Sequence, residues 1–97
     1  MHVIAKRTLR EYWEKHPNIR GALEAWHDHV KRADWATPAD LQQEYGSDAV
    51  LPDNRAVFKL RGNQYRLVVR INYATRRVYV RFIGTHAEYD RIDVMSV

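Results

Sequence analysis

The stretch Gln64-Tyr-Arg-Leu-Val-Val-Arg-Ile-Asn72 decides the fold, because its apolar side chains return at every second position. This period of two is typical of a β-strand with one buried face. The stretches Val57-Phe-Lys-Leu-Arg61 and Arg77-Val-Tyr-Val-Arg-Phe-Ile-Gly84 repeat the pattern on either side. We therefore predict three antiparallel strands in a meander, with one apolar face. The side chains predicted to face the core are Phe58, Leu60, Tyr65, Leu67, Val69, Ile71, Val78, Val80 and Phe82.

Turn signals separate these three strands. Gly62-Asn63, between the first two strands, is typical of a two-residue hairpin loop. Residues 72–76 predict a longer turn before the third strand. Upstream of the meander, residues 47–54 contain a proline and follow Gly46, so we expect an irregular loop there.

The part of the chain before residue 47 predicts a short strand over Met1–Ala5 and then helices. Thr8 and Glu11 have the spacing of a capping box, which predicts the start of a helix that Pro17 ends. Asn18 is expected to cap a second helix, whose apolar residues return at helical spacing. Residues 37–40, Thr-Pro-Ala-Asp, predict a third, short helix. The tryptophans predicted to pack in the core are Trp13, Trp26 and Trp35.

Length and composition limit the classes of protein that this chain can form. Its 97 residues suffice for one domain, so we expect residues 1–97 to form a single α+β unit, with the N-terminal strand and two helices packed on an antiparallel sheet. The absence of cysteine excludes disulfides, thiolate zinc sites and cysteine nucleophiles. No apolar run approaches the ~20 residues that span a bilayer, and Met1–Ala5 is too short for a signal-peptide core, so we expect a cytoplasmic protein. His27 and His29 would not share a helix face, so we predict no metal site, and we expect no cofactor.

Positive charge is concentrated in the second half of the chain. The chain holds 16 Lys and Arg against 12 Asp and Glu, but residues 55–97 alone carry 9 basic and 3 acidic residues. Between Arg55 and His86, eight basic residues occur without a carboxylate. Because like charges on one surface repel, this bias favours a polyanionic partner such as nucleic acid. The alternative is a solvated basic face without a specific partner.

Strand alternation predicts that these charges project from the sheet face opposite the core. Neighbouring strands lie about 4.8 Å apart and same-face residues of one strand about 6.8 Å apart, spacings that suit the phosphates of single-stranded RNA. A tyrosine among them offers a ring on which a base can stack. In the alternative, some of the arginines lie along the sheet edge and only keep it soluble. The side chains predicted on this basic face are Lys59, Arg61, Arg66, Arg70, Arg77 and Arg81, with Tyr79 among them.

The residues after the third strand, Thr85-His-Ala-Glu-Tyr-Asp90, bring an imidazole, a phenol and two carboxylates to the end of the basic sheet. Histidine can act as a general acid or base near neutral pH, and arginines can stabilise charge that builds on a phosphate. These groups suit RNA cleavage by attack of its own 2′-hydroxyl. The alternative for His86 is that it only bonds the backbone at the strand end. For Glu88 and Asp90 we favour a structural role, in which the two carboxylates stabilise the start of a helix.

The stretches 57–71 and 78–90 resemble the HigB-type toxins of bacterial type II toxin–antitoxin systems, which belong to the RelE superfamily. The resemblance implies a RelE-like fold and an mRNA interferase that cleaves mRNA on the ribosome without a metal. It also implies neutralisation by a HigA-type helix-turn-helix antitoxin. The catalytic residues that the resemblance implies are Arg66, Arg81, His86 and Tyr89, and the RNA-binding residues that we expect beside them are Lys59, Arg61, Arg70, Arg77 and Tyr79.

Two other functions stay open at this point. A non-catalytic RNA- or ribosome-binding module would need the arginines but not His86. An inactive member, kept only to bind an antitoxin, would need neither.

Overall fold

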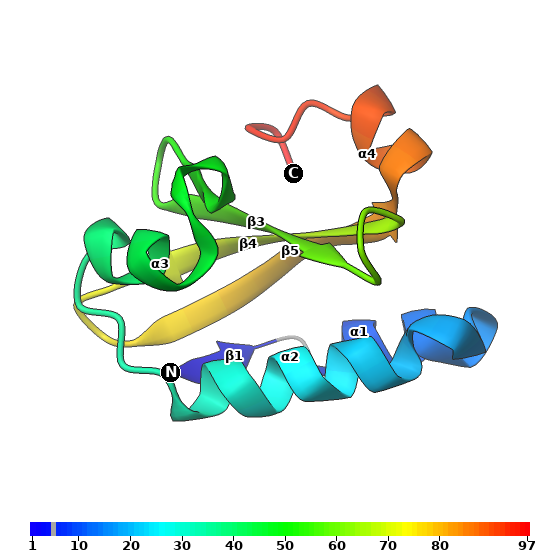
Figure 1. The fold of residues 1–97 in the computed structure, drawn as a ribbon, viewed down its shortest axis with the longest axis horizontal. Helices are drawn as coiled ribbons and strands as arrows, with labels where there is room; N and C mark the ends of the chain where they lie inside the picture. Colours follow the sequence, from blue (N-terminus) through cyan, green and yellow to red (C-terminus); the bar gives the residue numbers. More distant parts are fainter. Residues whose placement is uncertain (5) are drawn as a thin grey trace.

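A mixed sheet of five strands crosses the middle of the protein, in the order β1-β5-β4-β3-β2 (Figure 1). The computed structural model describes residues 1–4 and 6–97, so Ala5, the last residue of the predicted N-terminal strand, lies outside the described residues. The predicted meander of β3, β4 and β5 is confirmed, and β1 adds to it in parallel with β5. The strands are β1 (His2–Ile4), β2 (Val50–Leu51), β3 (Arg55–Leu60), β4 (Tyr65–Asn72) and β5 (Arg77–Thr85).

Two helices, α1 (Lys6–Lys15) and α2 (Arg20–Arg32), pack together against one face of this sheet (Figure 1). The apolar residues of α2 return at helical spacing and are buried, because that stripe faces the sheet. The ring of Trp26 meets that of Phe58 edge to face, with centroids 5.3 Å apart. The α+β class predicted from the sequence is therefore confirmed. Fully buried core residues include Leu9, Ile19, Leu23, Val30, Leu41, Leu67 and Val69.

Two further helices are short and begin with capping boxes. In α3 (Pro38–Tyr45), the box joins Thr37 and Asp40, so the predicted third helix is confirmed, and Gly46 follows the helix with φ 88°. Such a positive φ is open to glycine at little cost. In α4 (His86–Arg91), which follows β5 directly, the box joins Thr85 and Glu88.

The predicted starts of the first two helices are wrong. Helix α1 already begins at Lys6, so Thr8 lies within it, and Glu11 accepts a hydrogen bond from Arg7 Nε at 3.1 Å. Asn18 lies in a short 3₁₀ helix, η1 (Pro17–Ile19), and its Oδ1 accepts from the Tyr65 hydroxyl at 3.1 Å. Its side chain therefore joins the helices to the sheet instead of capping α2.

Two loop predictions also change. The expected irregular loop over residues 47–54 contains a second 3₁₀ helix, η2 (Ser47–Ala49), and the short edge strand β2. The hairpin between β3 and β4 is confirmed, but its last strand pair is Leu60 with Tyr65, so the loop has four residues and not two. Both Arg61 (φ 49°) and Gly62 (φ 65°) adopt a left-handed conformation in this loop.

A bulge in β5 reverses the predicted direction of its last side chains. Val69 pairs with Val80 whereas Val68 pairs with Phe82, so Arg81 is an extra residue without a partner on β4. Beyond the bulge, Ile83 packs against the core in place of Phe82. The prediction that Phe82 faces the core is therefore wrong, because one inserted residue exchanges the two faces of a strand.

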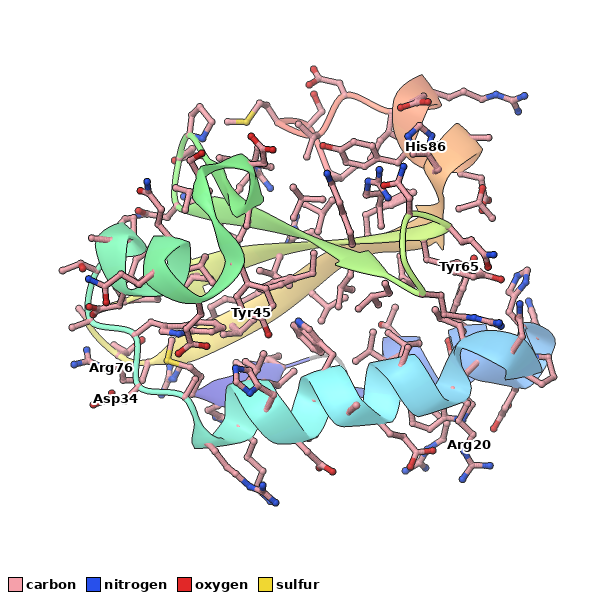
Figure 2. The ribbon with its side chains drawn as sticks, in the orientation of Figure 1. Arg20, Asp34, Tyr45, Tyr65, Arg76 and His86 are labelled. Atoms are coloured by element: carbon pink, nitrogen blue, oxygen red, sulfur yellow. The ribbon has the colours of Figure 1, made fainter. Side chains whose placement is uncertain are left out.

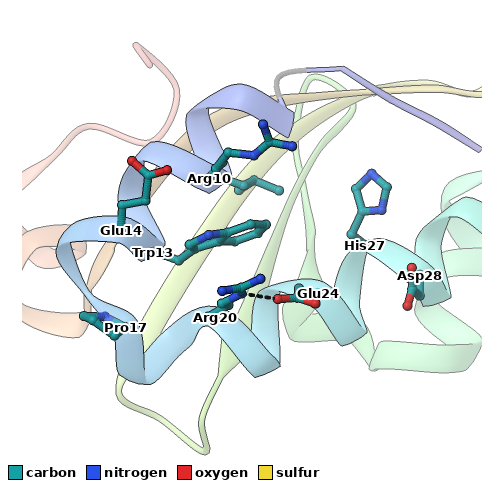
Figure 3. A pocket seen from close by; sticks show the side chains of 9 residues that line it. Arg10, Trp13, Glu14, Pro17, Arg20, Glu24, His27 and Asp28 are labelled. Carbon is teal, nitrogen blue, oxygen red and sulfur yellow. Dashed lines mark hydrogen bonds and ion pairs between the residues drawn. The ribbon is translucent and has the colours of Figure 1, made fainter.

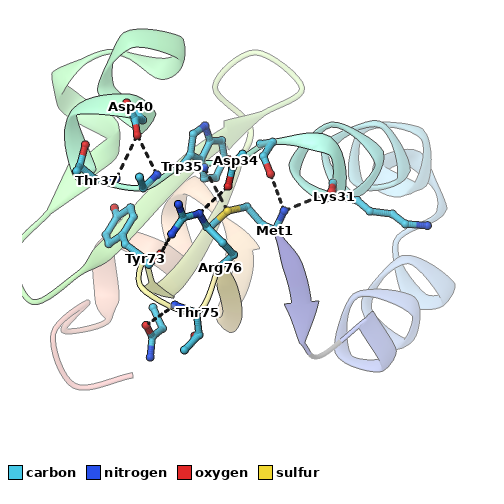
Figure 4. A network of polar contacts seen from close by, with 12 residues as sticks. Met1, Lys31, Asp34, Trp35, Thr37, Asp40, Tyr73, Thr75 and Arg76 are labelled. Atoms are coloured by element: carbon cyan, nitrogen blue, oxygen red, sulfur yellow. Dashed lines mark hydrogen bonds and ion pairs between the residues drawn. The ribbon is translucent and has the colours of Figure 1, made fainter.

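Polar contacts tie the β4–β5 turn to the end of α2 (Figure 4). Arg76 Nε donates to Asp34 Oδ1 at 2.6 Å, and its Nη1 donates to the Tyr73 carbonyl. The Met1 amine donates to the Ala33 carbonyl at 2.6 Å. Tyr73 is buried in the core, so its ring is not available on the basic face.

No helix in the described ranges is both long enough and apolar enough to span a membrane.

Candidate nucleic-acid interface

The sheet face away from α1 and α2 carries most of the predicted basic residues. Strand pairing places Lys59 beside Arg66, and Arg70 between Arg55 and Tyr79. The side chains of Lys59, Arg70, Arg77 and Arg81 are exposed on this side or at its edge, and Tyr79 is half-buried. We define this basic face by Arg55, Lys59, Arg66, Arg70, Arg77, Tyr79 and Arg81.

Arg61 does not belong to the basic face. It lies in the loop beyond β3, and its Nη1 donates to the carbonyl of Asn18 at 2.9 Å. Asn18 also accepts from the core residue Tyr65, so Arg61 reaches toward the helical side of the sheet. The alternation that predicted otherwise ends where the left-handed backbone of the loop begins.

A stack of three side chains forms where β4 and β5 meet α4. The Arg66 guanidinium carbon lies 5.9 Å from the centroid of the Tyr89 ring, and the rings of Tyr89 and Phe82 meet edge to face at 6.5 Å. Arg66 is only 5% exposed, and its Nη2 donates to Asn63 Oδ1 at 2.7 Å. The Phe82 ring lies directly over Gly84, where a Cβ would be 2.6 Å from Cζ of that ring. These contacts hold the Tyr89 ring in one place.

His86 is the first residue of α4 and lies on the same side of the sheet (Figure 2). Its Nδ1 is 3.0 Å from Asp90 Oδ2, and its side chain is 46% exposed. A carboxylate at Nδ1 favours the tautomer that leaves Nε2 available to accept a proton. The backbone N–H of His86 donates to the Gln64 carbonyl at 2.9 Å, but its side chain pairs with Asp90.

Glu88 has the structural role that the sequence suggested for it. Its Oε1 accepts from the Thr85 N–H at 2.8 Å, and its own N–H donates to Thr85 Oγ1 at 3.1 Å. These bonds, the one from the Thr85 backbone first, hold the pKa of Glu88 below its usual value. Asp90 differs, because it partners His86. The spacing of four residues on a helix was the sequence signal for that pair.

A second group of site residues surrounds a hollow nearer the β4–β5 turn. Arg70, Tyr79 and Arg81 line it, together with Asn54 and Asn72. Arg70 also approaches Asp53, with Nη2 3.5 Å from Oδ1. The exposed cations and the tyrosine ring of this hollow can bind phosphates and stack on a base.

The four predicted catalytic residues fall into these two groups. Arg66, His86 and Tyr89 lie around α4, whereas Arg81 lines the hollow with Arg70 and Tyr79. Arg66 and Arg70 are four residues apart on β4, which corresponds to about 13 Å along the strand. The residue after Arg81, Phe82, contacts Tyr89, so the backbone of β5 connects the two groups at this point.

The sequence analysis did not predict that the C-terminal segment, residues 92–97, lies on this face. It leaves α4 and passes over the sheet on the side away from α1 and α2 (Figure 1). Arg55 donates to two of its carbonyls, from Nη1 to Val97 at 2.7 Å and from Nη2 to Met95 at 3.2 Å. On the same face as Arg55, Val68 is fully buried. Arg55 lies on the same face as Lys59, four residues along β3, but the sequence analysis did not assign it there, and nothing in the sequence indicated what covers it.

The helical layer has a groove of its own between α1 and α2 (Figure 3). The Arg20 guanidinium lies over the Trp13 ring there and pairs with Glu24 at 2.5 Å. The groove contains none of the predicted site residues and lies across the sheet from α4. Within residues 1–4 and 6–97, no group of three His, Asp or Glu side chains is placed to hold a metal ion.

Comparison with known proteins identifies similar chains. Residues 19–92 match the HigB_toxin family, described as the RelE-like toxic component of a toxin–antitoxin system. The mRNA interferase HigB of Escherichia coli O6:H1 is 32% identical over 94 residues, which cover 95% of this chain and 91% of that protein. The mRNA interferase toxin HigB of Escherichia coli K12 is 28% identical over 92 residues, which cover 93% of this chain and 88% of that protein. The mRNA interferase HigB of Shigella flexneri is similar to the same extent.

Proposed function

Since the chain belongs to the HigB toxin family, the RelE-like toxic components of toxin–antitoxin systems, we propose that it is an mRNA interferase, an endoribonuclease that cleaves messenger RNA. The observation that carries this proposal is the His86–Asp90 pair, which lies on α4 beside the Tyr89–Arg66 stack. These groups stand at the end of a sheet face whose exposed charges are basic.

The proposed reaction is attack of the RNA's own 2′-hydroxyl on the adjacent phosphorus. His86 Nε2 removes the hydroxyl proton while Asp90 holds the imidazole through Nδ1. The new P–O2′ bond forms as the P–O5′ bond breaks, and the 5′-oxygen leaves with a proton. The products are a 2′,3′-cyclic phosphate and a 5′-hydroxyl. We propose that the Tyr89 hydroxyl supplies this leaving-group proton or orients the phosphate.

Charge that builds on the phosphate needs cations. Arg81 is exposed at the bulge, and among the described residues it has no hydrogen-bond partner, so its guanidinium is available to the phosphate. Arg66 lies over the Tyr89 ring, and we propose that it acts by positioning this ring. We propose that Lys59, Arg70 and Arg77 hold neighbouring phosphates and that Tyr79 stacks on a base. Because these side chains supply both base and cations, we expect cleavage to persist in the presence of chelators.

The proposal extends to the partners of the toxin. We expect messages held by the ribosome in the cytoplasm to be the substrate, and a HigA-type helix-turn-helix antitoxin to neutralise the protein. The family resemblance supports both partners, and the basic face supports the RNA.

Expression of the protein without its antitoxin tests the function. We expect growth arrest and cleaved messages with 2′,3′-cyclic ends, and His86→Ala should lose roughly 10²- to 10⁴-fold in cleavage rate, the usual contribution of a general acid or base. His2→Ala, which removes an exposed histidine of β1, is the matched control and should cleave normally.

Two results would support the other candidate functions. Growth arrest without cleavage, unchanged in His86→Ala, would indicate a non-catalytic RNA- or ribosome-binding module. A protein that neither arrests growth nor cleaves RNA, yet binds its antitoxin, would be an inactive member.

A further inference from the structure

The hairpin loop between β3 and β4, residues 61–64, lies at the end of the sheet that carries α4 (Figure 1). On the helical side, Arg61 Nη1 donates to the Asn18 carbonyl at 2.9 Å. On the other side, the Gln64 carbonyl accepts from the His86 N–H at 2.9 Å. The loop therefore joins η1 to the first residue of α4.

The same loop also holds Arg66. Asn63 accepts two hydrogen bonds from the Arg66 guanidinium, through its carbonyl at 3.0 Å and through its Oδ1 at 2.7 Å. The guanidinium that is held in this way lies over the Tyr89 ring. One short loop thus fixes the backbone of His86, the proposed base, and, through Arg66, the ring of Tyr89.

The backbone of this loop is not favourable for the residues that form it. Arg61 (φ 49°) and Gly62 (φ 65°) are both left-handed, and the Gln64 N–H donates to the Arg61 carbonyl at 3.3 Å. A left-handed conformation costs glycine little, but it is unfavourable for arginine. All four loop residues are exposed, so burial does little to hold the loop in this shape. The hydrogen bond from Arg61 to the Asn18 carbonyl, which we call the latch, compensates for this by tying the loop to the helical layer.

We propose that Arg61 is a positioning residue of the cleavage reaction and acts through this latch. With the latch formed, the loop holds His86 and Tyr89 in the relative positions that the reaction needs. Without it, the loop samples other conformations, and both groups lose their fixed places. This inference rests on the proposed function, because the two groups are those of the same proposed site.

Arg61→Ala tests the latch. Its cleavage rate should fall roughly 2- to 10-fold, as expected for the loss of one hydrogen bond, whereas the slope of log K against log salt for RNA binding should stay unchanged. The rate is measured in single turnover on ribosome-bound mRNA with saturating toxin. Binding is measured by fluorescence anisotropy of an oligoribonucleotide in a His86→Ala background, which keeps the RNA intact. An unchanged rate would overturn the latch, and a slope lower by about 0.7 would then show that Arg61 holds a phosphate instead.

Two further substitutions separate the latch from the strain of the backbone. Arg61→Gly relieves the left-handed conformation but removes the guanidinium, so it should lose cleavage rate as Arg61→Ala does. Arg61→Lys keeps a cation that can donate to the Asn18 carbonyl, so it should retain most of the rate. Normal cleavage by Arg61→Gly would overturn the latch, because the backbone conformation alone would then account for the loss in Arg61→Ala.

Hydrogen exchange reports on the loop independently of cleavage. The His86 amide should exchange faster in Arg61→Ala, because its acceptor lies in the loop, while the amide of the fully buried Leu67 on β4 should keep its rate. Arg76→Ala is the matched control. Arg76 (φ 58°) is another left-handed arginine, and in the β4–β5 turn it bonds Asp34 beyond α2. Its loss should lower the melting temperature but change neither exchange at His86 nor the cleavage rate.

The outcomes distinguish this inference from the function on which it rests. Unchanged exchange at the His86 amide in Arg61→Ala, or equal acceleration in Arg76→Ala, would overturn the latch and leave the ribonuclease standing. Absence of cleavage by the unmodified protein would overturn the proposed function itself.

Discussion

The guanidinium of Arg66 lies over the ring of Tyr89, with Cζ 5.9 Å from the ring centroid. Arg66 also bonds Asn63 through both terminal nitrogens, at 3.0 Å to its carbonyl and 2.7 Å to its side chain. Strand alternation placed Arg66 on the basic face, where it would contact a phosphate. In the structure it is buried against the ring of Tyr89, the proposed catalytic tyrosine. Arg66 is thus placed to position Tyr89.

Arg66→Lys is expected to lower cleavage without weakening RNA binding. A lysine keeps the charge but loses both the planar stack on Tyr89 and the two bonds to Asn63. Misplacing a catalytic group costs roughly 10- to 100-fold in rate. Single-turnover cleavage measures the rate, and the salt dependence of binding should be unchanged. Arg66→Gln removes the charge as well, so a slope that falls by about 0.7 in that variant would show instead that Arg66 contacts a phosphate directly.

Gly84→Ala is expected to disturb the stack of Phe82, Tyr89 and Arg66 through Phe82. The new Cβ would lie 2.6 Å from Cζ of Phe82, so the Phe82 ring must move against Tyr89. Overpacking of this kind costs about 1–3 kcal/mol, which a thermal melt detects, and cleavage should fall with it. Gly21→Ala on α2 is the control, since a Cβ there has nothing within 4 Å and should leave both quantities unchanged or slightly raise stability.

Arg70→Ala tests the phosphate contacts of the exposed part of the face. Each contact to single-stranded RNA contributes roughly 0.7 to the slope of log K against log salt, so the variant should bind more weakly and less steeply. Arg10→Ala on α1 removes the same charge from the helical layer and should leave the slope near that of the unmodified protein. Equal slopes in all three proteins would show that Arg70 holds no phosphate.

Trp26→Ala tests the packing of α2 on the sheet. Trp26 is buried and its ring meets Phe58, so truncation should cost about 3–5 kcal/mol in the free energy of unfolding. A domain of this size has roughly 5–15 kcal/mol in all, so denaturant unfolding should begin much earlier. Trp26→Phe, which keeps a ring, should lose less; equal losses would argue against ring packing as the cause.

The contact between α2 and α3 predicts a pH dependence of stability. The pKa of Glu44 lies below its usual value of 4.5, chiefly because His29 bonds its carboxylate at 2.7 Å, with a further bond from Trp35 Nε1. A carboxyl whose pKa is lowered by folding stabilises the fold above its unfolded value, and that stabilisation is lost as the pH falls below it. Glu44 is 41% exposed, so solvent screening limits the effect to about 1 kcal/mol or less.

The test compares melting temperatures over pH 3–7. Glu44→Gln should melt lower than the unmodified protein at neutral pH, and the difference should shrink as the pH falls below about 4.5. Glu14→Gln, on exposed α1, is the control for loss of one charge. A difference that is constant with pH would contradict the assigned cause.

Local patterns in the sequence were sufficient for the meander, the third helix and the burial of Trp26 and Trp35. Each depends on neighbours in the chain: a period of two, a capping box between Thr37 and Asp40, or an apolar stripe. The predicted directions of the last side chains of β5 were wrong because the strand is irregular there. One extra residue at Arg81 changed which of Phe82 and Ile83 faces the core, and alternation carries no signal for a bulge.

The sequence by itself therefore determined the fold class, the basic strands and the place of His86 directly after the last strand, because those properties follow from spacing along the chain. Only the tertiary structure decided that Arg66 is buried under Tyr89, that Arg61 turns to the helical side, and that residues 92–97 cover Arg55. Each of these contacts joins residues 23 to 43 positions apart. Pairings at such distances depend on how strands and helices pack, which no local periodicity encodes.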